Sequence, residues 1–437
     1  MRKNLFKKVL ALTLASTMAF SMAGCGSKGG SSDAKNDDGT ITLNVWHQWS
    51  NDTNELKGKY EEAVKAYEKE NPGVKIKTET LDTEAYKTKI NAEFAGDAKG
   101  IDVFYWWGAG TAKKLVDAGK VMALDDYVTD DVKSKILEGS TSAFEFDGKL
   151  YSVPMFSWYM TLFCNKTLFD KAGAKLPETY DELVDAVKKL KKLDGVTPMA
   201  AGAKDGWNAA FVYQALALRE VGATGVNEML SGKKEFGDEG FKKAAQKVSD
   251  LYEMGAFGNN PLEQGNDDAN AAFENGKAAM RLMGSWFANN VYTDDAATIK
   301  PEEVVALKIP TIADGKGEAT DYCGGFVESF WVNNNTKYKE EAAKFCIYIN
   351  EKMGVASYET GSGFSGWTTP ADESNLNPLF IQIKDLLAEG KQGVLAWDTS
   401  LESEPAAVHN EQVQTLFADG ADIDAFIDEH KAAINGK

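Results

Sequence analysis

The sequence predicts an α/β fold, and three observations lead to this prediction. Alternating apolar and polar residues at 41–45 and 74–78 are each followed by apolar residues at helical spacing. The run from Ile101 to Trp107 is almost entirely apolar or aromatic, which is typical of a strand buried on both faces of a sheet covered by helices. The chain of 437 residues is also long enough for two or more domains. Strands and helices in alternation favour a parallel sheet.

The first half of the chain continues this alternation. Helical spacing is present over about 56–67 and 84–94 and near Leu115 and Val132. The pair Asp147-Gly148 lies between two apolar segments, which indicates a hairpin. After Pro154 a strand resumes at 161–164, and a helix follows from Asn165 to Gly173. We place the first crossing between two lobes at 152–157.

The second half begins with the clearest helix signal of the chain. Thr179 can cap the free amides of a helix while Glu182 reaches back to the cap residue. Further helices are predicted from Trp207 and over about 240–254, 266–275, 342–349 and 416–427, and strands at 277–283, 304–309 and 326–332. The glycine- and proline-rich segment 361–370 is predicted to be a further crossover.

The N-terminal segment 1–24 has the layout of a secretory signal: basic residues, a short apolar run and then small residues. Its apolar run is too short for a typical membrane-spanning helix. Met22-Ala-Gly-Cys25 resembles a bacterial lipobox, in which cleavage precedes Cys25 and diacylglycerol is attached to its sulfur. Residues 25–40 are almost entirely small or polar, so we expect a flexible tether. The alternative is an ordinary secreted protein with an unmodified Cys25.

Charge and cysteine content restrict the remaining possibilities. The formal net charge of −18 repels nucleic acid and anionic lipid, so neither is an expected partner. With Cys25 lipidated, three cysteines remain, at most one disulfide can form, and their apolar neighbours favour buried free thiols: Cys164, Cys323 and Cys346. The histidines have no metal-ligand spacing, and we predict neither a metal site nor a cofactor.

Most tryptophans stand at strand ends or helix starts, not at helix-core spacing. They are Trp46, Trp49, Trp106, Trp107, Trp158, Trp207, Trp286 and Trp397. Ligands of open α/β sheets lie beyond the carboxyl ends of strands, and Gly108 and Gly110 after Trp107 allow a close approach. An indole offers a flat apolar face and one N–H donor, which suits a sugar ring. Because an unpartnered buried hydroxyl costs roughly 1–3 kcal/mol, polar neighbours are needed as well, and His47, Gln48, Asn208 and Asp398 are available. The alternative for each indole is core packing.

Four segments resemble the extracellular solute-binding proteins of sugar ABC transporters, family 1, which are maltose-binding-protein-like. They are ITLNVWHQW at 41–49, IDVFYWWGAG at 101–110, the run 162–191 and GKAAMRLMGSWFANNV at 276–291. The most specific piece is Asn165 to Leu183. The resemblance implies a class II periplasmic-binding-protein-like fold, with two α/β lobes joined by a multi-strand hinge. The implied lobes are 41–153 plus 311–362 and 157–308 plus 366–437, with the hinge near 152–157, 308–312 and 361–367.

The resemblance also assigns positions in the cleft. Trp106 matches a stacking position after a first-lobe strand, and Trp158 matches the point where the chain enters the second lobe. Trp207 and Trp286 match second-lobe cleft positions, Gly324 and Gly325 match the pair that returns the chain to the first lobe, and Trp397 with Asp398 lies in a variable segment. Trp158 stands where maltose-binding relatives can carry a carboxylate, and Gly108-Ala-Gly110 replaces a charged loop. The sequence is therefore more similar to relatives that take xylo-oligosaccharides or α-galactosides.

The predicted function is capture of an oligosaccharide and its delivery to an ABC permease by a monomer. The protein is expected at the outer face of the cytoplasmic membrane, held by its lipid alone, or in the periplasm. One alternative is a secreted carbohydrase, which needs two carboxylates roughly 5–9.5 Å apart across the cleft. None of the 66 acidic residues stands in a recognisable catalytic setting. Another alternative is a binder of a quaternary amine or polyamine that uses the tryptophans as a cation–π cage.

Overall fold

The computed structural model describes residues 39–51, 55–293 and 297–436. The predicted signal, Cys25 and all but the end of the predicted tether lie outside these ranges. Within them, no helix combines the length and the apolar composition that a bilayer crossing needs.

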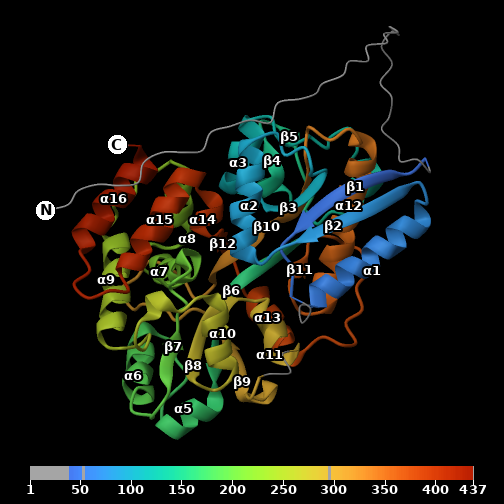
Figure 1. Cartoon of the computed structure of the whole chain (residues 1–437). Coiled ribbons are helices and arrows are strands. Elements are labelled where there is room, and N and C mark those ends of the chain that lie inside the picture. Colours follow the sequence, from blue (N-terminus) through green and yellow to red (C-terminus); the bar gives the residue numbers. More distant parts are fainter. Residues whose placement is uncertain (1–38, 52–54, 294–296, 437) are drawn as a thin grey trace, which may run out of the picture. The chain divides into compact units, whose positions relative to one another are not determined.

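In the described part of the chain, ten strands form one mixed sheet with the order β2-β1-β3-β10-β6-β8-β7 along its main path (Figure 1). Strands β9 and β11 also pair with β6, and β12 pairs with β10. The strands of this sheet are β1 (Ile41–His47), β2 (Val74–Thr80), β3 (Val103–Trp107), β6 (Phe156–Asn165), β7 (Thr197–Ala200), β8 (Ala278–Gly284), β9 (Val304–Leu307), β10 (Asp321–Val332), β11 (Phe364–Ser365) and β12 (Gln392–Val394). A separate hairpin consists of β4 (Glu145–Phe146) and β5 (Lys149–Leu150).

The helices surround this sheet (Figure 1). They are α1 (Glu55–Glu70), α2 (Thr83–Ala95), α3 (Ala109–Asp117), α4 (Asp130–Lys135), α5 (Lys166–Ala172), α6 (Tyr180–Leu190), α7 (Gly206–Val221), α8 (Ala223–Leu230), α9 (Glu239–Glu253), α10 (Asn266–Glu274), α11 (Phe287–Thr293), α12 (Lys339–Glu359), α13 (Pro378–Ala388), α14 (Trp397–Ser400), α15 (Ser403–Thr415) and α16 (Ile423–Asn435).

Local sequence signals account for the ends of several elements. The Thr179 hydroxyl accepts the amide of Glu182, and the Glu182 carboxylate accepts the amide of Thr179, so the predicted capping box is confirmed. Asp147 and Gly148 have φ values of 50° and 74°, which the predicted hairpin turn requires. The remaining cysteines Cys164, Cys323 and Cys346 are buried free thiols, as predicted.

The prediction of a parallel sheet is correct in part. Strand β1 runs parallel to β2 and β3, and β7 runs parallel to β8. Strand β10 is antiparallel to both β3 and β6, and β6 is antiparallel to β8 and β9. The prediction is wrong for β6 and β10 because these two strands connect the halves of the sheet, and a chain that returns beside its outgoing strand runs in the opposite direction.

Strand β10 belongs to both halves of the sheet. Residues 324–328 pair with β6, whereas residues 328–332 pair with β3. We call the half that contains β1–β3 the first lobe and the half that contains β6–β9 the second lobe. Thr311 forms a bridge with Thr179, and Gly317 donates its amide to the Arg219 carbonyl, so the chain after β9 still contacts the second lobe. We therefore move the second proposed crossing from 308–312 to 324–328 and keep those at 152–157 and 361–367 as proposals.

A chain of hydrogen bonds through two buried histidines links three helices of the second lobe. His430 Nδ1 donates to the Phe426 carbonyl at 2.8 Å, so its Nε2 accepts from His409 Nδ1 at 2.9 Å. His409 Nε2 then accepts from the Gln214 amide at 3.0 Å. Each ring thus donates from one nitrogen and accepts at the other, which is the pattern of the neutral form. Burial lowers the pKa of His430 to about 4 and holds the pKa of His409 well below its usual range.

Acid should weaken the fold through this histidine pair. In the unfolded chain both rings take up a proton near pH 6.5, whereas in the folded chain they do so only at much lower pH. The free energy of unfolding should therefore fall as the pH drops from about 6.5 toward about 4. Calorimetric melting temperatures between pH 7 and 4.5 measure this slope. His430→Gln should have a shallower slope than the wild type, and parallel curves would contradict the assignment.

Candidate interlobe binding site

Three of the predicted binding tryptophans gather in the second lobe. The Trp158 ring, on β6, stacks on Phe211 of α7 at 5.4 Å between ring centroids and meets the Trp286 ring edge-on at 5.0 Å. Trp207, in the first turn of α7, meets Phe211 edge-on at 5.3 Å. Trp158 is buried, but Trp207 and Trp286 are only half-buried. We call these four residues the second-lobe aromatic cluster.

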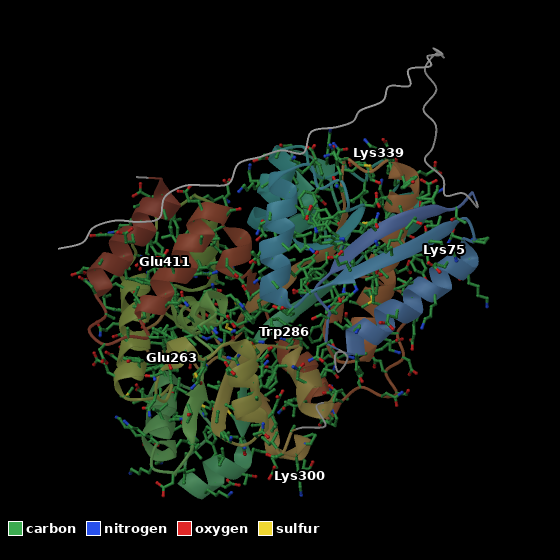
Figure 2. The ribbon with its side chains drawn as sticks, viewed as in Figure 1. Lys75, Glu263, Trp286, Lys300, Lys339 and Glu411 are labelled. Atoms are coloured by element: carbon green, nitrogen blue, oxygen red, sulfur yellow. The ribbon has the colours of Figure 1, made fainter. Side chains whose placement is uncertain are left out.

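The Gly-Ser-Trp sequence at the end of β8 positions Trp286 beside β6 (Figure 2). Gly284 is needed because the Trp286 ring folds back over it, and a Cβ at that position would lie 2.0 Å from the ring. Ser285 Oγ accepts the amide of Tyr159 at 3.2 Å, which ties the turn to β6. The glycine therefore provides the space in which the indole lies.

The start of α7, which carries Trp207, is held by a buried arginine that the sequence analysis did not identify. Arg281 donates to the side-chain oxygen of Asn208 at 2.7 Å and to that of Asn266 at 3.1 Å. It also donates to Asn270 and to the carbonyls of Ala200 and Ala201. Burial lowers the pKa of Arg281 to about 9, so the guanidinium stays charged at neutral pH.

In the first lobe, the strand-end indoles of Trp106 and Trp107 meet edge-on at 5.4 Å between ring centroids, but they differ in exposure. Trp106 is 4% exposed, and its Nε1 donates to the Thr111 carbonyl at 3.5 Å. Trp107 is half-buried, meets the Tyr105 ring edge-on at 5.3 Å and lies opposite Glu328 in the β3–β10 pairing. The resemblance assigned the stacking position to Trp106, but Trp107 has the more exposed ring of the pair.

Lys87, on α2 of the first lobe, connects the two groups of indoles. Its Nζ lies 5.1 Å from the centroid of the Trp107 ring and 5.8 Å from that of the Trp207 ring. Trp107 and Trp207 therefore face the same space from different lobes. Lys87 also forms an ion pair with Glu84 at 3.0 Å. Asp398 lies nearby: burial raises the pKa of its carboxyl, while the charge of Lys87 opposes the rise.

Contacts beside this space show why glycines follow Trp107. A Cβ on Gly108 would lie 2.4 Å from the Ala143 carbonyl, and one on Gly110 would lie 2.3 Å from the Leu401 carbonyl. Thr111 Oγ1 also donates to the Asp398 carbonyl at 3.3 Å. The sequence analysis expected these glycines to admit a ligand, but they admit other segments of the chain itself.

Four other predicted residues belong to the interior. His47 and Trp49 pack in the first-lobe core, with the His47 ring 4.2 Å from that of Tyr60 and the Trp49 ring 5.9 Å from that of Phe330. Trp46 is buried, with Lys89 over its ring. Trp397 is only 1% exposed, stacks on His409 at 4.9 Å and meets Tyr213 and Phe241 edge-on. We leave all four out of the site.

Gly324 and Gly325 act through the backbone of β10. Their φ values are 134° and 150°, and they pair with Tyr159 and Trp158 of β6. A Cβ on Gly324 would lie 2.0 Å from the Trp158 carbonyl. The two glycines therefore let β10 pass close to the strand that carries Trp158, which positions that indole.

Sequence reasoning missed Lys87, Arg281 and Glu328. The sequence could have identified Glu328 as a candidate functional residue, because it is an acidic residue in the otherwise mostly apolar strand 326–332. It is 7% exposed, and burial raises its pKa to about 7, although Tyr105, Trp107 and Lys87 oppose the rise. Lys87 had no such signal, since a lysine on an exposed helix face is common.

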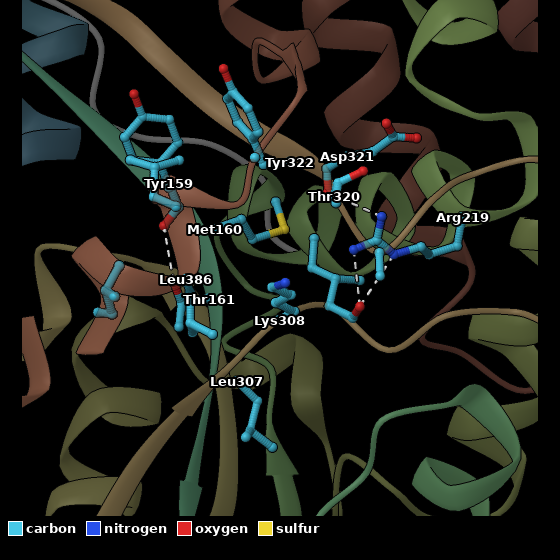
Figure 3. A pocket seen from close by; sticks show the side chains of 15 residues that line it. Tyr159, Met160, Thr161, Arg219, Leu307, Lys308, Thr320, Asp321, Tyr322 and Leu386 are labelled. Carbon is cyan, nitrogen blue, oxygen red and sulfur yellow. Dashed lines mark hydrogen bonds between the residues drawn. The ribbon is translucent and has the colours of Figure 1, made fainter.

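A hollow lies beside β6 and the start of β10, lined by residues that include Tyr159, Lys308 and Tyr322 (Figure 3). Arg219 borders it but donates to the backbone: to the Ile309 carbonyl at 3.0 and 3.2 Å and to the Asp321 carbonyl at 3.1 Å. The guanidinium of Arg219 is therefore already hydrogen-bonded to backbone carbonyls, and no tryptophan lines this hollow. We place the candidate site at the indoles instead.

Comparison with known proteins identifies the family and the fold. The family model of the bacterial extracellular solute-binding proteins matches residues 50–355. A solved structure described as "Biochemical and structural insights into xylan utilization by the thermophilic bacterium Caldanaerobius polysaccharolyticus" is 36% identical. That match covers 90% of this chain and 99% of the other, with a TM-score of 0.85.

Two further proteins are more distant. The structure of a chitin oligosaccharide binding protein is 22% identical, with a TM-score of 0.81 over 91% of this chain and 98% of the other. The multiple sugar-binding protein of Streptococcus mutans is 24% identical over 368 residues, which are 81% of this chain and 80% of that protein. The fold is that of the class II periplasmic-binding-protein-like receptors. The chain belongs to the bacterial extracellular solute-binding protein family.

Proposed function

We propose that the protein binds an oligosaccharide between its lobes and delivers it, chemically unchanged, to an ABC permease. The observation that carries the proposal is that Trp107 and Trp207, from different lobes, both lie over Lys87 Nζ. Two indole faces across one space suit the two apolar faces of a sugar ring. Contacts to both lobes exist only when the lobes are closed, so the ligand shifts an equilibrium toward the closed form that the permease recognises.

Among neutral sugars, we propose xylo-oligosaccharides first. The 36% identical structure comes from work on xylan utilization, and its identity is higher than a likeness of fold alone requires. The neighbours described with chitin oligosaccharide or mannotriose are 22% and 21% identical and support the fold alone. Lipid attachment at Cys25, the monomeric state and a place at the outer membrane face or in the periplasm remain parts of the proposal.

The cation-binding alternative is disfavoured by the same contact. A quaternary amine caged by Trp107 and Trp207 would lie beside the ammonium of Lys87, and the two like charges repel, whereas an uncharged sugar meets no such repulsion. The carbohydrase alternative has one observation behind it: Glu328 and Asp398 both have raised pKa values, and both interact with Lys87. A general acid needs such a shift.

One screen separates these functions. The protein without its first 24 residues is incubated with xylotriose, maltotriose, raffinose, chitotriose, choline and spermidine, followed by thermal melting and chromatography of the sugars. We expect a raised melting temperature with one neutral sugar series, xylotriose first, and no cleavage products. Cleavage products would establish the carbohydrase, and a shift with choline or spermidine alone would overturn the oligosaccharide proposal.

A further inference from the structure

Glu328 occupies an unusual place in the sheet. It pairs with Trp107 of β3 on one side of β10 and with Phe156 of β6 on the other, where the register between β10 and β6 shifts. It thus lies where β10 passes from one lobe to the other. A shifted register re-aims the side chains next to it, and such irregularities are common beside functional sites.

The surroundings of this carboxyl leave part of its bonding capacity open. The titratable groups that face it are Tyr105 of β3 and Lys87 of α2. Tyr105 is fully buried, and its hydroxyl forms no hydrogen bond of normal geometry. Lys87 forms its ion pair with Glu84. Hydrogen bonding by Tyr105 and Trp107 stabilises the carboxylate only in part, because the pKa of Glu328 is still raised. A buried carboxyl without a directly paired cation is costly to a fold, which is consistent with a role in binding.

Trp107 brings this polar group next to the proposed ligand. The Glu328 and Trp107 side chains lie on the same face of the sheet because the two residues are directly opposite in register. A sugar ring that stacks on the half-buried Trp107 therefore presents its rim of hydroxyls toward Glu328 and the Tyr105 hydroxyl. Each hydroxyl carries a donor that needs an acceptor.

We propose that Glu328 recognises the ligand. Its carboxylate accepts hydrogen bonds from the hydroxyls of the sugar that stacks on Trp107, and its proton passes to the solvent when the sugar binds. The inference rests on the proposed function and deepens it. Only a proton moves, from the Glu328 carboxyl to the buffer. Because hydroxyl donors favour the charged carboxylate, the ligand and the proton compete for Glu328.

The sign of the pH dependence follows. With a pKa of about 7 in the free protein, Glu328 is protonated in roughly half of the molecules at neutral pH. Binding that requires the carboxylate strengthens as the pH rises through that pKa and levels off above it. Between pH 6 and pH 8 the affinity should rise by about tenfold.

Titration calorimetry with xylotriose tests the inference. At pH 7, heats in phosphate and in Tris differ by the number of protons exchanged, and we expect a fraction of a proton released by the wild type. Glu328→Gln keeps the shape of the neutral carboxyl, should release none, and should bind with the same affinity at pH 6 and pH 8. Glu340→Gln, a control on the exposed face of α12, should release protons as the wild type does.

Equal heats in the two buffers for the wild type would overturn the inference, and so would release by Glu328→Gln equal to that of the wild type. The buffer comparison needs no variant, so a misfolded variant leaves the test intact. Failure of every sugar in the preceding screen to bind would instead overturn the proposed function. The two failures are therefore distinguishable.

Discussion

Replacing Arg281 with methionine should lower the free energy of unfolding by about 3–5 kcal/mol, the range for removing one partner of a buried charged network. Arg281 is 1% exposed, and its donors serve three side-chain oxygens and two backbone carbonyls. Methionine fills much of the volume but donates nothing. The buried acceptors are then left without a partner, each at a cost of about 1–3 kcal/mol unless water reaches it.

Denaturant unfolding followed by tryptophan fluorescence measures this loss. Arg281→Lys should recover only part of it, because an ammonium lacks the planar fork that reaches several acceptors at once. Lys300→Met, at an exposed lysine, is the matched control and should change stability by less than about 0.5 kcal/mol. Full stability of Arg281→Lys would show that charge alone matters there and that the hydrogen-bond pattern does not.

Arg281 also shows what the sequence could have disclosed. The chain has 48 basic residues, but arginine stands only at positions 2, 219 and 281. Both arginines in the described ranges are buried, and both donate to oxygens of the surrounding chain. Where lysine covers the surface almost alone, a rare arginine indicates a buried position that needs several donors. This composition signal was available before the structure.

The α/β fold was predictable because its elements have local causes. Hydrophobic periodicity, the cap at Thr179 and the turn at Asp147-Gly148 each act over a few residues. The antiparallel course of β6 and β10 was not predictable in this way, because it depends on pairing between residues more than 150 positions apart. The early start of β10 at Asp321 was missed because the predicted strand began after Gly324-Gly325, whereas the pair lies inside the strand.

The candidate site was predictable to the level of residue type and strand end, but not of side-chain face. Period-two alternation would place Trp106 and Trp107 on opposite faces, but the end of β3 brings their rings into edge-on contact, and only the packing shows that Trp107 is the more exposed. Trp397 was predicted to bind ligand from a variable segment, but it begins α14 and packs against helices α7, α9 and α15. Lys87 enters the site only through the approach of α2 to α7.

Replacing Trp286 with alanine should weaken oligosaccharide binding by about 2–4 kcal/mol, the range for a binding hot spot, while the protein still folds. Trp286 is half-buried, so its ring has a free surface, and it is held in place by Gly284 and by the edge-on contact with Trp158. Titration calorimetry with xylotriose measures the loss of affinity, and circular dichroism checks the fold.

Two further variants separate binding from packing. Gly284→Ala keeps the indole but puts a methyl group where the ring now lies, so it should displace Trp286 and weaken binding in the same direction. Trp397→Phe removes an indole from the interior of the same lobe, and should lower stability but leave the affinity unchanged. If Trp286→Ala and Trp397→Phe both retain wild-type affinity, Trp286 is a packing residue and the second-lobe aromatic cluster does not bind the sugar. If Gly284→Ala retains wild-type affinity but Trp286→Ala does not, the Trp286 ring has accommodated the added methyl group. The role of Trp286 in binding is then decided by Trp286→Ala.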